Sequence, residues 1–178
     1  MRIMVKIRKG LLFLAFMTVV SFLLDCSVSR MTKEEKQQYR MMIAQKVKDS
    51  LENRTFSIDL NYVIPRRMRS HTLDYGYSIQ VKGDSVDAYI PFFGEAYRAE
   101  LGSQDQGLKY KGPMAGYEVQ KMKDDLYRVN ILVKKPLDEI LYQIEVFDNG
   151  IATLYVRSLN REDIRFNGEM VINENNQK

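Results

Sequence analysis

The chain contains a single histidine and a single cysteine, so the residue types used most often in catalysis and metal binding are scarce. A histidine-based nucleophilic triad would have to use His71, and no serine lies in the Gly-x-Ser-x-Gly pattern of a hydrolase nucleophile. A zinc site needs several cysteine or histidine ligands, and neither a glycine-rich phosphate loop nor a calcium-binding loop is present in the sequence. We therefore expect no metal, no cofactor and no enzymatic activity.

Carboxylates are the catalytic groups that composition leaves open, because the chain contains 23 aspartate and glutamate residues. Glycoside hydrolysis needs only two of them on either side of a sugar bond, and their separation in space cannot be read from the sequence. A carboxylate-dependent glycan hydrolase therefore stays as an alternative.

A basic cluster is formed by Arg66, Arg67 and Arg69, with His71 close behind them. Guanidinium groups suit carboxylates and phosphates, so this cluster could bind an anionic glycan, a lipid head group or an acidic partner. The competing interpretation is a solvated loop between two strands.

Residues 89–97 form the most unusual segment, with four aromatic side chains around a proline and a glycine. The four are Tyr89, Phe92, Phe93 and Tyr97. Pro91 ends strand pairing and Gly94 permits a sharp bend. In one interpretation Phe92 and Phe93 plug the open end of a sheet. In the other, Tyr89, Phe93 and Tyr97 line a groove for sugar or peptide.

The N-terminal 25 residues have the pattern of a lipoprotein signal peptide. Four basic residues precede an uncharged apolar run over 11–24, which is shorter than the roughly 20 residues of a spanning helix. Cys26 follows, with Leu23 at the lipobox position, although Asp25 replaces the small residue that usually precedes the cysteine. We expect acyl chains, including palmitate, on Cys26 and a lipidated tether over 26–31. The alternative is an uncleaved N-terminal anchor.

Location and charge follow from this signal. We expect the protein to lie in the cell envelope, anchored by lipid to the outer membrane and facing the periplasm, because no acidic run follows Cys26. The full chain has a net charge of +4, but removing residues 1–25 leaves 23 basic and 22 acidic residues. The membrane is therefore an expected partner and nucleic acid is not.

Behind the tether, the sequence predicts one domain over 32–172 and a flexible polar tail over 173–178. Thr32 and Glu35 have capping-box spacing before a helix over about 33–53. Its apolar stripe consists of Tyr39, Met42, Ile43, Val47 and Leu51. Period-two alternation then predicts about eight strands, with turns at Gly83-Asp84 and Asn149-Gly150, where Asn-Gly tolerates positive φ at both positions. We expect an α+β fold with this amphipathic helix packed on a curved, mainly antiparallel sheet.

Several blocks of the chain also resemble a known family. They are residues 89–97, 107–110 and 112–113, followed by Asn149-Gly150-Ile151-Ala152, 158–161 and 164–168. Over about residues 40–172 the chain is similar to a bacterial lipoprotein family known as domain of unknown function 4251. The resemblance implies a mainly β domain behind a lipoprotein signal in gut-type Gram-negative bacteria, and it implies no reaction, cofactor or catalytic residue.

Together these patterns favour a membrane-tethered envelope lipoprotein that acts as a non-enzymatic binding or protein-interaction module. The expected partner is an envelope protein or a glycan. The alternatives are the glycan hydrolase and a purely structural envelope protein.

Overall fold

The computed structural model describes residues 31–74, 76–97 and 108–172. The predicted signal peptide, Cys26 and the predicted tail over 173–178 lie outside the described residues. Contacts divide the chain into two units, Met1–Lys36 and Gln37–Lys178. Within the described part, no helix is both long and apolar enough to cross a membrane.

Helix α2 (Lys33–Glu52) begins with the predicted capping box. The Thr32 backbone N–H donates to Glu35 Oε2 at 2.7 Å, and the Glu35 N–H donates to Thr32 Oγ1 at 3.2 Å. The two bonds satisfy backbone donors that have no partner inside the helix.

The apolar stripe of α2 is only half as long as predicted. Ile43, Val47 and Leu51 are buried in the core, as expected. Tyr39 and Met42, also assigned to the stripe, are 42% and 38% exposed. The prediction was wrong there because helical spacing shows which side chains share a face, whereas only the second half of this face is buried.

Ten strands follow in the described part of the chain, rather than about eight. They are β1 (Thr55–Ile64), β2 (His71–Thr72), β3 (Ser78–Lys82), β4 (Ser85–Tyr89), β5 (Tyr110–Pro113), β6 (Gly116–Lys123), β7 (Leu126–Lys134), β8 (Glu139–Phe147), β9 (Ile151–Ser158) and β10 (Arg161–Met170). The count was too low because β2 and β5 are too short for alternation to reveal them.

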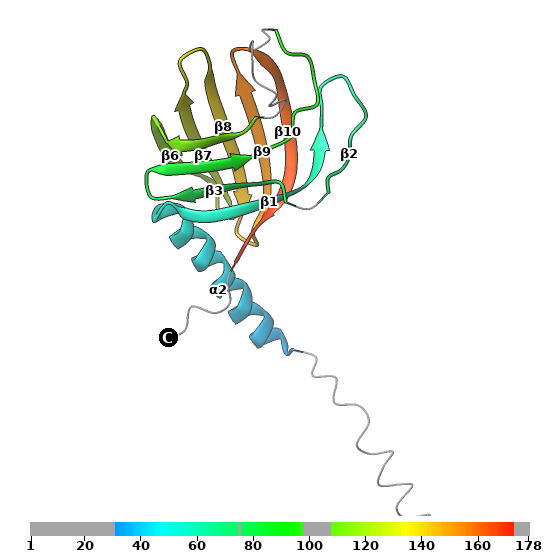
Figure 1. The fold of residues 1–178 in the computed structure, drawn as a ribbon. Helices are drawn as coiled ribbons and strands as arrows, with labels where there is room; N and C mark the ends of the chain where they lie inside the picture. Colours follow the sequence, from blue (N-terminus) through cyan, green and yellow to red (C-terminus); the bar gives the residue numbers. More distant parts are fainter. Residues whose placement is uncertain (1–30, 75, 98–107, 173–178) are drawn as a thin grey trace, which may run out of the picture. The chain divides into compact units, whose positions relative to one another are not determined.

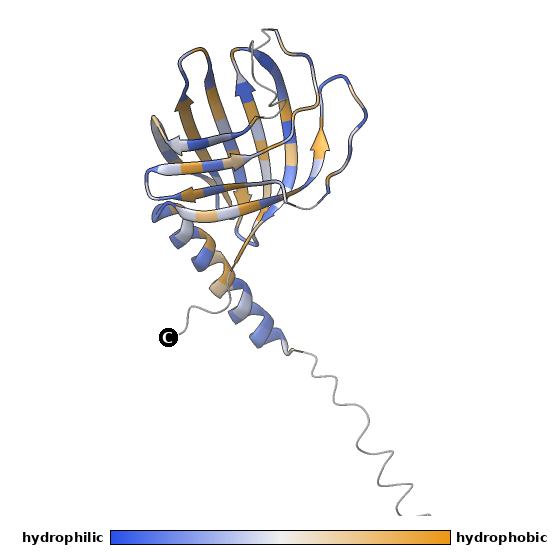
Figure 2. Cartoon of the chain, viewed as in Figure 1, coloured by the Kyte–Doolittle hydropathy of each residue, from blue (hydrophilic) through white to orange (hydrophobic). Residues whose placement is uncertain are grey.

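The strands form one curled antiparallel sheet in the order β5-β4-β3-β1-β10-β9-β8-β7-β6, with β2 on β1 (Figure 1). Its two ends, β5 and β6, are separated by only Met114 and Ala115 in the chain. The sheet must therefore curl until these two strands meet at that connection. Alternating hydrophobic and hydrophilic residues along the strands give it one apolar face, which encloses the core (Figure 2).

Two predicted turns are present, and one differs in detail. Gly83 has a φ of +59° between β3 and β4. Between β8 and β9 the φ of Gly150 is +88°, but Asn149 has no positive φ, so the turn is not the two-residue type that Asn-Gly suggested. The loop has three residues, Asp148 to Gly150, and Asn149 Oδ1 accepts a hydrogen bond from the Ile151 N–H at 3.0 Å. A three-residue loop needs the left-handed conformation only at its last position.

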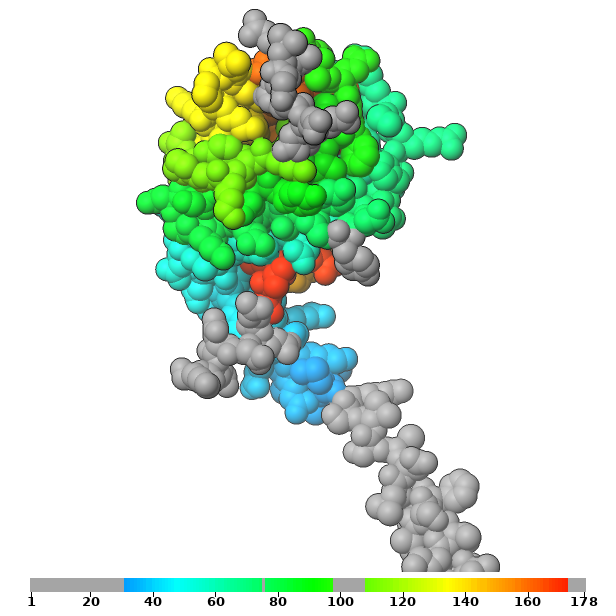
Figure 3. Space-filling model, viewed as in Figure 1, coloured from blue at the N-terminus to red at the C-terminus, as the bar shows by residue number. Residues whose placement is uncertain are grey.

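The strand registers place four connections at the end of the sheet away from the α2–β1 connection. We call this the loop end: residues 65–70 after β1, 91–97 after β4, 135–138 before β8, and 159–160 before β10. In the space-filling view, the β7–β8 turn (yellow) lies at the surface at the top (Figure 3).

Candidate functional site

The buried polar residues of the described chain gather at the loop end. Only Asp138, Asn160 and Glu162 combine a polar or charged side chain with less than 10% exposure there, at 6%, 9% and 3%. Burying a polar group costs free energy unless it forms hydrogen bonds or ion pairs, so we expect these three side chains to have specific partners at the loop end.

Sequence reasoning missed these three residues, although a signal was present. Asp138 continues the inward-facing alternation of β8, two positions before Ile140. Asn160 and Glu162 continue the inward-facing alternation of β10, before Ile164. A polar residue in phase with a buried face is the pattern that could have identified them.

Asp138 links the β7–β8 turn to the β9–β10 turn by hydrogen bonds, and we call this link the clip. Its carboxylate accepts hydrogen bonds from Ser158 Oγ at 2.9 and 2.8 Å and from the Leu159 N–H at 3.1 Å. In the same direction, Asn160 Nδ2 of the β9–β10 turn donates to the Leu137 carbonyl of the β7–β8 turn at 2.6 Å. The two turns are therefore fixed to each other by charged and neutral hydrogen bonds.

Tyr142 lies on the buried face of β8 near this clip. Its side chain is fully buried, and its hydroxyl has no hydrogen-bond partner among the described residues. Burial, followed by the nearby charge of Asp138, raises the pKa of Tyr142 well above the usual range of a phenol. The hydroxyl therefore stays protonated and is not a base.

Arg67 joins two acidic residues of the loop end. Its Nη1 donates to Glu95 Oε2 at 2.8 Å, and its Nε lies 3.0 Å from Glu162 Oε1. The second contact is an ion pair without hydrogen-bond alignment, since Glu162 Oε1 makes no hydrogen bond. Glu162 Oε2 accepts the Glu95 backbone N–H at 3.3 Å, so the buried carboxylate is held from both sides.

The 91–97 segment adds to β10 by backbone pairing. Ala96 bridges to Arg161, and the Glu162 N–H donates to the Glu95 carbonyl at 3.1 Å. The Tyr97 N–H donates to the Asn160 carbonyl at 2.7 Å. The segment is therefore part of the ordered structure of the loop end.

The four predicted aromatic residues make separate contacts. Phe92 lies under the Arg161 guanidinium at 5.1 Å, and Phe93 meets His71 edge-on at 4.7 Å. Tyr89 stacks on Tyr77 at 5.6 Å, with Lys109 4.7 Å from its ring centre. Phe92 and Phe93 are partly buried against the core, whereas Tyr89 and Tyr97 are 46% and 59% exposed. Thus the two phenylalanines pack against the core, and the two tyrosines face solvent.

The three arginines of the predicted basic cluster also lie in different surroundings. Arg67 belongs to the carboxylate network, while Arg66 lines a hollow on the outer face of the sheet. Arg69 is exposed, and its carbonyl lies 3.2 Å from His71 Nδ1. Adjacent residues in a loop point in different directions, so nearness in sequence did not make one basic site.

Large apolar side chains project from the turns of the loop end. Leu137 and Leu159, on the two clipped turns, are 75% and 73% exposed, and Met68 on the β1–β2 connection is 55% exposed. With Tyr97, each of the four connections carries one such side chain. The loop end therefore exposes four large apolar side chains, two of them on turns that hydrogen bonds of buried polar groups connect.

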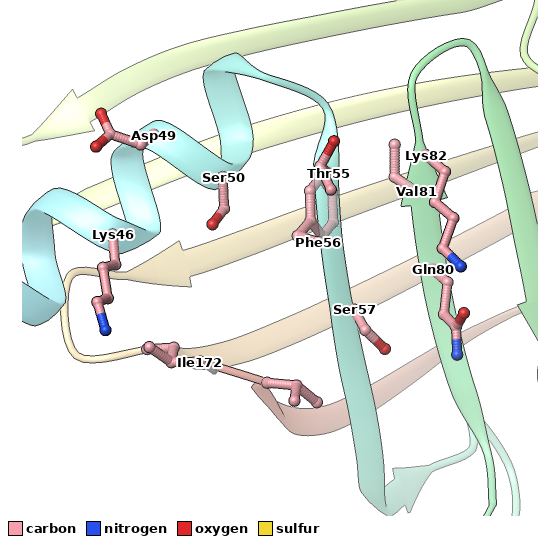
Figure 4. Close-up of a pocket in the computed structure, with 11 residues that line it drawn as sticks. Lys46, Asp49, Ser50, Thr55, Phe56, Ser57, Gln80, Val81, Lys82 and Ile172 are labelled. Carbon is pink, nitrogen blue, oxygen red and sulfur yellow. The ribbon is translucent and has the colours of Figure 1, made fainter. Parts of the chain in front are cut away.

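A second hollow lies beside helix α2, with a volume of about 340 Å³ (Figure 4). Lys46 and Ser50 extend from the helix toward Ile172 and β1, and Gln80 and Lys82 border it on β3. Its one acid, Asp49, accepts a hydrogen bond from Gln45 at 2.7 Å. The lining combines hydroxyl, amide and ammonium groups with apolar side chains.

No group of three histidine, cysteine, aspartate or glutamate side chains able to hold a metal occurs within residues 31–74, 76–97 and 108–172. The acids of the loop end that share a partner are Glu95 and Glu162, and both contact the Arg67 guanidinium.

Comparison with known proteins gives a family and a fold. The sequence model of the family described as "Domain of unknown function (DUF4251)" matches residues 34–170. A crystal structure of a DUF4251 family protein from Bacteroides eggerthii DSM 20697 superposes with a TM-score of 0.57 at 10% identity, covering 73% of this chain and 87% of that one. At this identity the likeness concerns the fold. No curated protein matches the chain.

Proposed function

Since the chain belongs to the DUF4251 family, which is defined by sequence and not by activity, we propose its function from its own surface. We propose that it is a lipoprotein of the bacterial cell envelope that binds a partner protein through its loop end. The described domain acts as an interaction module, and lipid on Cys26 keeps it at the membrane.

The observation that carries this proposal is the pair of exposed leucines on clipped turns. Leu137 and Leu159 are about three-quarters exposed, yet the backbone beneath them is fixed by Asp138 and Asn160. Exposed apolar side chains lose their contact with water when a partner covers them, and a fixed backbone avoids the entropy cost of ordering a loop on binding. A partner that covers both leucines therefore gains apolar burial at little cost in ordering the turns.

The glycan hydrolase is supported less well. A carboxylate pair that cleaves a sugar bond needs open space between its members for the substrate. The Arg67 guanidinium contacts both Glu95 and Glu162 and occupies that space. One acid of the pair is also 3% exposed, which leaves it little access to a sugar.

The loop-end proposal can be tested by crosslinking the full chain in its native membrane. We expect the crosslinked yield of the partner to be at least about tenfold lower with the L137S/L159S variant than with wild type, since burying each leucine side chain contributes about 1.5 to 3 kcal/mol. The matched control is I151S, because Ile151 is 51% exposed and begins β9 at the opposite end of the sheet. Equal yields from wild type and the double variant would refute the proposal.

The tether is tested separately by growing cells with a fatty-acid analogue. We expect label on the wild-type chain and none on C26S, because Cys26 is the only cysteine. Equal labelling of both chains would exclude lipid on Cys26 and would leave the loop-end surface unaffected.

A further inference from the structure

A hollow on the outer face of the sheet lies beside the proposed docking surface; it shares Pro65 and Arg66 with the loop end and contains none of the exposed apolar side chains of that end. It lies across the end of β1, β9 and the start of β10, and its volume is about 240 Å³. In the strand register, Arg165 stands between Ile64 on β1 and Tyr155 on β9. One row of outward-facing side chains therefore forms its centre, with an aromatic ring at one side and an aliphatic side chain at the other.

The charge around this hollow is strongly one-sided. Three arginines line it, Arg66, Arg157 and Arg165, against one acid, Asp163. Arg157 Nε lies 3.5 Å from Asp163 Oδ2, and both side chains are 60% exposed, so this ion pair is weak. The Arg165 guanidinium lies 6.0 Å from the Tyr155 ring centre, and Arg66 forms no ion pair with any described residue. Two guanidinium groups therefore have no carboxylate partner within the described part of the chain.

We propose that this hollow binds the carboxylate-bearing ring of a sugar acid. The planar fork of a guanidinium donates two parallel hydrogen bonds to a carboxylate, and Arg66 and Arg165 have donors to offer. The Tyr155 ring and the Ile64 side chain provide an apolar surface for the carbon face of the sugar ring. A simple inorganic anion would leave that apolar surface uncovered.

The size of the hollow agrees with this ligand class. Pockets for drug-sized ligands measure about 300 to 1,000 Å³, so a volume of about 240 Å³ suits a smaller unit of roughly one monosaccharide. The site is open on one side, and the same recognition would serve a free sugar acid or one residue of an acidic glycan. The shared chemistry is a six-membered ring with a carboxylate.

The test uses the full chain in detergent, with calorimetry and NMR spectra of the arginine Nε–H groups. We expect sodium galacturonate to bind saturably and to shift the signals of Arg66 and Arg165, while galactose does neither. R165A should weaken binding about tenfold, the effect of losing one charge-assisted hydrogen bond. Y155S should weaken binding, and Y155F, which keeps the ring, should not.

The matched control for charge is K121A, because Lys121 is an exposed cation on β6. Equal weakening by K121A and R165A would mean unspecific attraction and would overturn the proposal, as would inorganic phosphate binding as tightly as galacturonate. Absence of saturable galacturonate binding to a chain that unfolds cooperatively would also overturn it. A short oligogalacturonate that binds more tightly than the monomer identifies a glycan as the source, and equal affinity identifies the free sugar acid.

Discussion

Replacing Asp138 with alanine should release the two turns that carry Leu137 and Leu159. The substitution removes a buried carboxylate that accepts hydrogen bonds from Ser158 Oγ and from the Leu159 N–H. Ser158 ends β9 and Leu159 lies in the turn that follows, so the substitution breaks the hydrogen bonds that Asp138 makes to the β9–β10 hairpin.

The expected loss of stability follows from the number of hydrogen-bond donors that lose Asp138 and from the other acceptors that these donors keep. A hydrogen bond to a charged group contributes about 1.5 to 3 kcal/mol. The Leu159 N–H keeps a second acceptor, the Glu139 carbonyl at 3.3 Å, so its loss is partial. We therefore expect D138A to lower the free energy of unfolding by about 2 to 3 kcal/mol. D138N keeps one carbonyl acceptor and should cost about half as much.

The assay is urea unfolding of the full chain in detergent at neutral pH, combined with a double-mutant cycle. S158A removes the same hydrogen bonds from the other side, so D138A and S158A should be coupled by about 1 to 2 kcal/mol. In the native membrane, D138A should also reduce partner crosslinking while both leucines are still present. The reasoning is refuted if D138A changes the free energy of unfolding by less than about 0.5 kcal/mol, or if the two substitutions are additive.

Three further predictions concern stability. A methyl group at Gly168 would overlap the Asp59 carbonyl oxygen, so G168A should cost about 3 kcal/mol, whereas G116A, which meets only Leu132 Cβ at 3.5 Å, should cost under about 0.5 kcal/mol in the same urea titration. R67M leaves the buried Glu162 charge without its cation and should lower the free energy of unfolding by about 2 kcal/mol, a value reduced for the 60% exposure of Arg67. Adding E162Q should restore part of this stability. An R67M variant with unchanged stability would contradict the ion-pair assignment. Burial, opposed by Arg54, raises the pKa of Tyr117 to about 12, so the folded state favours the neutral phenol and stability should fall as pH rises from about 10 toward 12. Because this side chain is partly exposed, Y117F should remove only about 1 kcal/mol of that fall in unfolding measured across this pH range, and an unchanged slope would exclude Tyr117 as its cause.

Local patterns predicted most of the elements correctly. The Thr32–Glu35 capping box and the α2 boundaries are confirmed, because capping depends on residues three positions apart. The alternation in β7 to β10 and the position of the hairpin at Gly150 are also confirmed, because strand phase and glycine turns depend on adjacent residues, whereas the positive φ predicted for Asn149 is absent. The family assignment from short sequence blocks is confirmed over residues 34–170.

The candidate site was predicted far less well. Sequence reasoning treated Arg66, Arg67 and Arg69 as one cluster, but the fold assigns Arg66 and Arg67 to different surroundings. It selected exposed aromatic residues and overlooked Glu162, a polar residue in phase with a buried strand face. Binding by Tyr89 and Tyr97, which face solvent, stays a prediction.

The sequence by itself determined the helix start, the strand phases, the turns and the family, because each depends on the conformational preferences of neighbouring residues. The proposed lipid attachment at Cys26 rests on the sequence alone and stays a prediction. Tertiary structure decided how far α2 is buried, how the sheet curls to bring β5 to β6, and which partners Asp138 and Arg67 find. The physical reason is that a buried polar group is stabilised by partners from other strands and turns, and only the folded chain brings those partners within hydrogen-bond distance.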